Sequence, residues 1–395
     1  MFCLVFTRGA KLRKSRTPSN AIVVLSKTEL STASNSKDGI SLISPLMRHI
    51  SEIAFTDPVY KDQSNSGFTQ FMLRYIRDAR DIVFIHLILK ILLVIVPIAP
   101  YLYLPGQFSW WVAVGYLAIN WAFFTPPYIL MLHCTSHRPL FKRDYDWMNK
   151  IIPWFLGPFF GETPETYFGH HMGMHHPENN LREDLSSTIE YQRDSFGDFM
   201  KYFLRFFTLG MVDLTNYFTR KKRFKLRKNT VLGELSWYAF VIVMSFVNWQ
   251  ATLAVFIIPF VFTRFMMMAG NWGQHAFVDA DAPANCYRNS ITCIEVAYNK
   301  QCFNDGYHIV HHIKPSMHYT EMAKEFRDNL EDYKREKAIV FEGIDFFMVW
   351  FFLMTGKYKT LAKKFVRLDD TFKSDDEVIA FLKTRTKRLP EEKLI

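Results

Sequence analysis

The chain has few cysteines, and their placement excludes two kinds of stabilising or metal-binding framework. Of 395 residues only five are cysteines, an odd number without a C-x-x-C pair: Cys3, Cys134, Cys286, Cys293 and Cys302. This pattern supports neither a disulfide framework nor a cysteine zinc site. We therefore expect reduced, buried thiols.

The N-terminal segment also lacks two features. No acidic residue precedes Glu29, and the apolar stretch Met1–Phe6 is too short for the core of a secretory signal. Residues 1–66 are rich in Ser, Thr, Lys and Arg, which is typical of an organelle transit peptide or of a disordered tail. We predict a disordered or targeting segment over residues 1–66.

The rest of the chain contains long apolar runs between basic segments. The whole chain is 49% hydrophobic and 16% aromatic, with a net charge of +10. Basic residues beside apolar runs more often indicate an anionic membrane face than nucleic acid. We predict an integral membrane protein with no nucleic-acid partner.

Four segments have the length and composition of membrane spans, which need about 20 apolar residues. They are residues 82–104, 108–132, 232–248 and 250–269. The first two are joined at Pro105-Gly106 and the last two at Trp249, so both turns are very short. The sequence predicts an all-α membrane fold of four transmembrane helices in two hairpins, with a kink at Pro126-Pro127.

Other apolar segments are predicted to lie on the membrane surface. Residues 68–80 alternate apolar and basic side chains, and residues 151–160 and 196–218 are too short or too charged to span. Residues 338–356 contain Glu342 and Asp345, which favours a surface-lying amphipathic helix over a fifth span. We expect a membrane domain over residues 67–356 and a basic cytosolic tail over residues 357–395.

The distribution of charge predicts the topology. The two short turns carry no Lys or Arg, whereas the opposite loops carry nearly all of them, including the run Arg220–Arg223. The positive-inside rule therefore places both termini in the cytosol or its equivalent. All histidine clusters fall on that same side and form part of a cytosolic helical cap.

Nine histidines form four short clusters along the chain. They are His133 and His137; His171, His175 and His176; His275; and His308, His311 and His312. Residues three or four apart share one face of a helix, so each cluster is expected to aim its rings at one point. Nine imidazoles are too many for one ion but suit two ions of iron, copper, zinc or nickel.

Several other residues are candidates for supporting roles. Asn271 precedes His275 by one helical turn, so its amide oxygen is a candidate to hold a metal-bound water, with a helix-capping bond as the alternative. His170 and His318 are candidate neighbours of the ligands, whereas His49 and His86 are expected to be structural. The acids that could orient ring N–H groups are Asp144, Asp146, Glu162, Glu165, Asp184, Asp279, Asp305 and Glu321.

Two reaction classes fit such a site. A redox metal open to dioxygen explains why spans lead directly into the ligands, because a lipid substrate then enters from the bilayer. Two zinc ions would instead suit a membrane hydrolase or a non-catalytic metal-binding protein.

The motifs HCTSH, HHMGMHH, NWGQH and HIVHH resemble the histidine boxes of the membrane fatty acid desaturase–hydroxylase superfamily. The resemblance covers roughly residues 82–330. It implies two non-haem iron ions held by the nine histidines, dioxygen as co-substrate, a lipid acyl substrate, and electrons from outside. It also implies that Asn271 supports a metal-bound water.

The resemblance leaves the reaction open. The spacing His171-x-x-x-His175-His176 is similar to that of the membrane alkane hydroxylases, whereas many acyl desaturases have HxxHH. We expect a fatty acyl desaturase, with an alkane- or acyl-chain hydroxylase as the alternative.

No His-Pro-Gly-Gly haem element is present, so electrons are expected from a separate b-type cytochrome or ferredoxin. Basic segments on the cytosolic side would attract an acidic carrier of this kind. We expect the endoplasmic reticulum membrane, with a plastid or other organelle membrane as the alternative.

Overall fold

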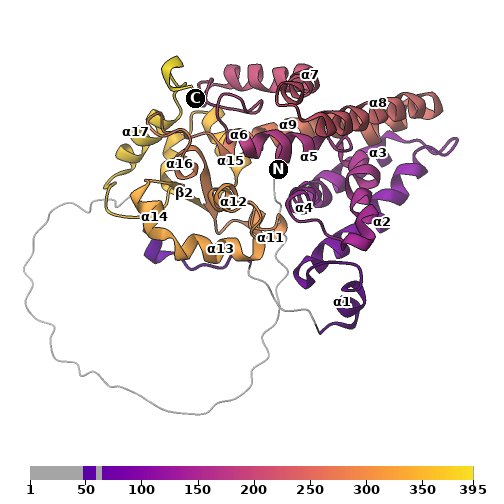
Figure 1. Cartoon of the computed structure of the whole chain (residues 1–395), viewed down its shortest axis with the longest axis horizontal. Coiled ribbons are helices and arrows are strands. Elements are labelled where there is room, and N and C mark those ends of the chain that lie inside the picture. Colours follow the sequence, from indigo (N-terminus) through magenta and orange to yellow (C-terminus); the bar gives the residue numbers. More distant parts are fainter. Residues whose placement is uncertain (1–47, 59–64, 395) are drawn as a thin grey trace, which may run out of the picture. The chain divides into compact units, whose positions relative to one another are not determined.

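The computed structural model describes residues 48–58 and 65–394, which form helices and one small sheet (Figure 1). The helices are α1 (Gly67–Met72), α2 (Ile82–Tyr101), α3 (Trp110–Ile119), α4 (Thr125–His137), α5 (Thr166–His170), α6 (His176–Glu178), α7 (Phe196–Arg220), α8 (Phe224–Thr252), α9 (Ile258–Gln274), α10 (Cys286–Asn289), α11 (Ala297–Gln301), α12 (His308–Ile313), α13 (Tyr319–Asp328), α14 (Leu330–Arg335), α15 (Phe346–Met354), α16 (Tyr358–Lys364) and α17 (Asp375–Arg385). The predicted N-terminal segment lies mostly outside the described residues.

Among the described residues, two helical stretches are long and apolar enough to cross a membrane. They are Ala79–Tyr101 and Phe224–Gln274. In α2, Ile85, Ile88 and Ile95 recur at helical spacing and are buried, while Leu93 on the other face is 76% exposed. The prediction of a long apolar helix from residue 82 is therefore confirmed; the four-span arrangement stays a prediction.

The second stretch is interrupted at Asn248, close to the predicted turn. Its φ of −159° and ψ of 101° are not helical, and its side chain accepts a hydrogen bond from the Ala251 N–H at 3.1 Å. This bond caps the first turn after the break. Beyond it the chain runs back, since the Trp237 ring stacks on Phe260 at 4.2 Å and the Phe240 ring contacts Phe256 at 5.0 Å.

Helices α3 and α4 form one run that changes geometry just before the two prolines. Residues 120–124 form a π-helical turn, and the Thr125 N–H donates to the Asn120 carbonyl. Pro126 and Pro127 have no N–H for the carbonyls four residues earlier, and their rings crowd those carbonyls. The helix geometry therefore changes one turn ahead of the prolines, and the kink itself stays a prediction.

Two surface-helix predictions are wrong in extent. The helix predicted over residues 68–80 ends at Met72, because the following residues pair with another segment: the Arg77 N–H donates to Leu140 and the Lys142 N–H to Tyr75. The segment predicted as one amphipathic helix over 338–356 instead divides at Gly343, whose φ of +71° favours glycine. It forms strand β2 (Ile339–Glu342) and then helix α15, which is buried on one face.

The sheet was not predicted and consists of two parallel strands. Strand β1 (Ile291–Ile294) pairs with β2 in the register Ile291 with Ile339 and Ile294 with Glu342. Both strands are short, apolar and largely buried. Such a run of apolar residues cannot be told from a segment of buried helix by its hydrophobic pattern. Helices α15, α16 and α17 contribute side chains to the same core, including Leu361 and Leu382. The predicted C-terminal tail thus contains helices that pack against the sheet.

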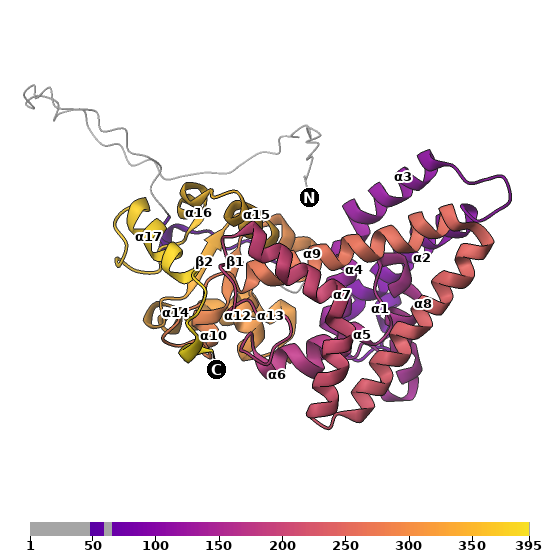
Figure 2. The same cartoon turned by 90° about the horizontal axis from the view of Figure 1, so that it is seen from above.

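In both views the long helices α2, α3 and α8 lie on one side, and the sheet with α10–α17 lies on the other (Figure 2). Helix α9 runs from the first side to the second. The C-terminal ends of α4 and α9 lie where the two sides meet.

The loop before the second histidine cluster is clamped onto the long helices. A Cβ at Gly233 of α8 would lie 1.7 Å from the Pro164 carbonyl oxygen, so the backbone approach requires glycine. The Arg264 guanidinium of α9 donates to the Gly161 carbonyl at 3.1 Å and to Glu234 at 3.4 Å. The loop therefore holds a fixed position relative to α8 and α9.

We predict that Gly233→Ala lowers the free energy of unfolding by about 3 kcal/mol, because backbone must shift to admit the methyl group. Thermal or denaturant unfolding in detergent micelles measures this. Gly115→Ala is the control, since nothing lies within 4 Å of its added Cβ; it should leave stability unchanged or raise it slightly. Equal stability of both variants would contradict the close approach.

Candidate metal centre

The nine predicted histidines come from four places in the fold. His133 and His137 lie in the last turns of α4, and His275 directly follows α9. His171 and His175 lie in the π-helical turn between α5 and α6, and His176 is the first residue of α6. The last three, His308, His311 and His312, are in α12.

The structure brings all nine together in two groups. The first group is His133, His137, His171, His176 and His311, and the second is His175, His275, His308 and His312. Within each group, one ring nitrogen from every residue lies within 4.8 Å of all the others. The prediction that the clusters converge is therefore confirmed.

The clusters do not each aim at one point, however. His175 belongs to the second group while its neighbours His171 and His176 belong to the first. In the same way, His311 belongs to the first group and its neighbours in α12 to the second. Two short segments thus bridge the two groups.

A π-helical turn explains how the second cluster does this. The His176 N–H donates to the His171 carbonyl, five residues back, rather than to a carbonyl four residues back. This widened turn carries one extra residue, and such turns are frequent at functional sites. It brings His171 and His176 to one group, with their Nε2 atoms 3.1 Å apart.

The ring nitrogens lie so close together that hydrogen bonds between neutral rings cannot account for all of these contacts. In the first group, His311 Nε2 lies 3.0 Å from His133 Nε2 and 2.9 Å from His176 Nε2. In the second, His308 Nε2 lies 3.2 Å from His275 Nε2 and 3.0 Å from His312 Nε2. A neutral imidazole has one N–H, so lone pairs face each other at these distances unless a cation lies between them.

In two of these histidines the other ring nitrogen, Nδ1, donates a hydrogen bond, as is usual for histidines that bind metals. His175 Nδ1 donates to the Asp184 carboxylate at 2.7 Å, and His275 Nδ1 donates to the Asn289 carbonyl at 2.9 Å. Both acceptors lack a proton to give, so Nδ1 carries the hydrogen and Nε2 presents its lone pair to the group. His133 Nδ1 lies 3.4 Å from an Asp305 oxygen.

The comparison with known families agrees with this arrangement. The model of the fatty acid desaturase family matches residues 108–343, which is more than half of the chain and includes every histidine of both groups. The chain belongs to the fatty acid desaturase family. No curated protein matched the sequence.

Family membership gives the general activity. The protein is an oxidoreductase of lipid metabolism that acts on a lipid acyl substrate in a membrane context. The donor set of its two histidine groups fits non-haem iron.

Burial keeps several histidines of this desaturase-family site in the neutral form that binds metals. Burial, reinforced by the neighbouring histidines, lowers the pKa of His137 to about 3 and the pKa of His275 to about 3. The same causes hold the pKa of His308 and His311 well below the usual range.

Asp184 behaves in the opposite way and stays ionised. Its burial acts to raise its pKa, but His175 and the Ser186 hydroxyl outweigh that effect and hold the pKa well below its usual value. The carboxylate also accepts from the Asn180 N–H at 2.9 Å and the Ser186 hydroxyl at 2.7 Å. These bonds fix the acceptor that orients His175.

Asn271 lies one turn before His275, as predicted, and its amide nitrogen is fully engaged. Nδ2 donates to the Ser186 carbonyl at 2.9 Å and to the Tyr202 hydroxyl at 2.8 Å.

The remaining histidines lie outside both groups. His49 caps a short turn at Ile50, and the His86 ring stacks on Phe68. His170 has a buried Nε2 with no hydrogen-bond partner among the described residues, and its ring lies 6.5 Å from that of His175. His318 caps α13 through Nδ1, so its other nitrogen donates to Asp81 at 3.0 Å.

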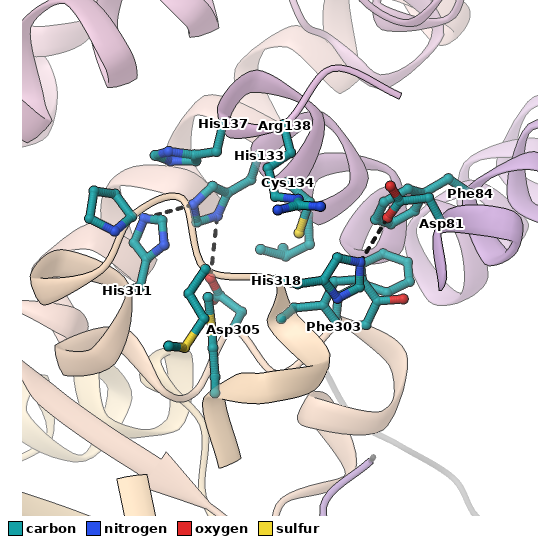
Figure 3. A pocket seen from close by; sticks show the side chains of 15 residues that line it. Asp81, Phe84, His133, Cys134, His137, Arg138, Phe303, Asp305, His311 and His318 are labelled. Carbon is teal, nitrogen blue, oxygen red and sulfur yellow. Dashed lines mark hydrogen bonds and ion pairs between the residues drawn. The ribbon is translucent and has the colours of Figure 1, made fainter. Parts of the chain in front are cut away.

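A small cavity adjoins the first group (Figure 3). His133, His137 and His311 lie on one side of it, and the pair His318–Asp81 lies on the other. Its volume is about 30 Å³, enough for a water molecule. Cys134 lines it without joining either group, and burial raises the pKa of that thiol well above its usual value.

Of the eight acids suggested by the sequence, Asp184 and Asp305 lie beside ligand histidines. Several others form ion pairs, such as Asp279 with Arg288 and Arg385.

The sequence did not single out Asn289, Tyr202 or Arg193. The buried Arg193 donates to the carbonyls of Thr188 and Ala276, both next to the site. Only the spatial neighbours of these residues reveal their roles.

We predict that Asp184→Asn weakens metal binding at the second group by about 10- to 100-fold, because the charge that orients His175 is lost. Chelator competition with the purified protein measures this. Asp213→Asn is the matched control, since Asp213 pairs only with Arg205 on α7. Unchanged affinity in Asp184→Asn would show that the carboxylate does not support a ligand.

Proposed function

We propose that the protein is a membrane di-iron enzyme that uses dioxygen and external electrons to desaturate a fatty acyl chain. The observation that carries this proposal is the convergence of nine imidazole nitrogens in two adjoining groups. The first ion is bound by His133, His137, His171, His176 and His311. The second is bound by His175, His275, His308 and His312, with Asn271 supporting a bound water.

The spacing of the nitrogens favours iron over zinc. Imidazole nitrogens bind first-row metals at about 2.0–2.1 Å, so two ligands at a right angle lie about 3.0 Å apart, whereas tetrahedral ligands lie about 3.4 Å apart. Adjacent Nε2 atoms are 2.9–3.2 Å apart here. Five nitrogens at right-angle spacing exceed the four-coordinate site typical of zinc. This argues against the zinc hydrolase and the non-catalytic alternatives.

Iron bound there supplies redox chemistry with dioxygen. The reaction removes two hydrogens from –CH₂–CH₂– to give –CH=CH–, and with dioxygen, two electrons and two protons it yields two waters. The protein's own part is to present neutral nitrogens, to fix their direction through Asp184 and the Asn289 carbonyl, and to exclude bulk water. His133, His175 and His275 are all buried, in keeping with the last role.

Four spans in two hairpins account best for the long helices. The break at Asn248 and the antiparallel ring contacts on either side of it support the second hairpin. Phe246, near that break, is 88% exposed and Trp111 of α3 is 87% exposed, as expected for side chains that face lipid. The histidine groups then lie on the cytosolic side, and we place the protein in the endoplasmic reticulum membrane.

The electron donor is a separate protein, for which a b-type cytochrome is the first choice and a ferredoxin the second. The chain lacks the haem element of a fused cytochrome. Its exposed basic residues include Arg220 and Lys225, which would steer an acidic carrier.

Hydroxylation of an alkane or acyl chain is the second candidate. The extra residue of the second cluster favours it, because the spacing is similar to that of membrane alkane hydroxylases. Both reactions begin by removing hydrogen from an unactivated methylene. The outcome then depends on how the chain lies relative to the two groups.

We predict about two iron ions per chain and a new double bond in lipids of a host that expresses the protein. Elemental analysis and lipid profiling measure the two. Zinc without iron would reject both the desaturase and the hydroxylase hypotheses. Iron together with hydroxylated but no newly unsaturated acyl chains would reject desaturation and favour the hydroxylase.

We predict that His175→Ala abolishes turnover while the protein still inserts into membranes, because a ligand of the second ion is lost. Product formation and membrane fractionation measure this. His86→Ala is the control, since its ring stacks on Phe68, away from both groups. Turnover retained in His175→Ala would remove this residue from the ligand set.

A further inference from the structure

The two histidine groups are unequal, and the difference points to the surroundings of Asn271. The first group contains five histidines and the second four. Asn271 lies in the last turn of α9, four residues before His275, which directly follows the helix. Its side chain is therefore a candidate to complete the second group.

The amide of Asn271 has a single possible orientation. One neighbour is the Ser186 carbonyl, which only accepts hydrogen bonds, so the nitrogen and not the oxygen must face it, at 2.9 Å. The same nitrogen donates its second hydrogen to the Tyr202 hydroxyl at 2.8 Å. Both hydrogens of Nδ2 are thereby used, and Oδ1 is left as the outward acceptor.

Tyr202 is equally constrained. Its hydroxyl has one hydrogen, which it donates to the Ser186 carbonyl at 3.3 Å while accepting from Asn271. The side chain is only 3% exposed, and its ring packs against Trp272 with centroids 5.0 Å apart. The hydroxyl therefore has a fixed position from which to orient the amide.

The same network reaches a histidine of the second group. The Ser186 hydroxyl binds Asp184 at 2.7 Å and lies 3.3 Å from His175 Nδ1. Tyr202, from α7, thus joins the amide on α9 to the loop that orients His175.

We propose that Tyr202 is a positioning residue that, together with the Ser186 carbonyl, holds the Asn271 amide in place and so keeps Oδ1 as the acceptor available to the second metal ion or its water. This rests on the proposed function, since it concerns the second ion of that site. Tyr202 acts through Asn271 and not on the substrate. We expect its effect at the second group and not at the first.

The test uses the full-length protein reconstituted with ⁵⁷Fe, and compares wild type, Tyr202→Phe, Asn271→Ala and the double variant. We expect every protein to bind iron, with one of the two Mössbauer doublets altered in Tyr202→Phe and the other unchanged. Because Tyr202 acts through Asn271, the double variant should match Asn271→Ala alone. Unfolding temperatures confirm that each variant is folded.

Tyr191→Phe is the matched control. Its ring contacts Tyr202 at 5.7 Å and Trp272 at 5.8 Å, so it removes a nearby hydroxyl without touching the amide. An unaltered spectrum in Tyr202→Phe, additive changes in the double variant, or the same change in Tyr191→Phe would each overturn the inference. Zinc in place of iron in the protein as isolated would instead reject the proposed function.

Discussion

The fold depends on keeping nine imidazole rings in contact inside a largely apolar protein. Rings such as His171 and His308 are buried, and the lowered pKa of each means that neither is charged at neutral pH. Their Nε2 lone pairs converge at distances that are unfavourable without a cation. The carboxylate of Asp184 and the carbonyl of Asn289 fix the rings from outside. In the proposed di-iron site we therefore expect metal affinity and correct folding of this region to be linked.

The long helices determine where the second histidine cluster lies. Arg264 and Glu234 are charged residues on apolar helices, an arrangement that is costly unless the charges are paired. Arg264 also binds Gly161 and Thr163, in the loop that leads to α5 and His171. The pair thus connects α8 and α9 to the loop before the cluster. A polar interaction between apolar helices thus helps to hold the loop that leads to the site, together with the close approach of Gly233 to Pro164.

The sequence predicted most of the site and less of the fold. The nine histidines were identified because four clusters with helical spacing are rare, and the long apolar helix from Ile82 was identified by its length and composition. The division of the clusters between two groups was not predicted, because helical spacing assumes α-geometry and His171–His175 forms a π-turn. Strands β1 and β2 were missed because four buried residues carry no alternating pattern. Asn289 contributes a backbone carbonyl, which no side-chain motif reveals.

The bridging segments also determine the relation between the two histidine groups. The segment His171–His176 and helix α12 each supply histidines to both groups. The separation of the groups is therefore set by two short helical turns and not by distant packing. In the first turn the π-geometry adds a residue between the two ligands of the first group, and His175, inside that turn, belongs to the second. A shorter second cluster, with HxxHH spacing, would need a different path for this backbone. The spacing His171-x-x-x-His175-His176 thus corresponds to a specific local geometry between the two histidine groups.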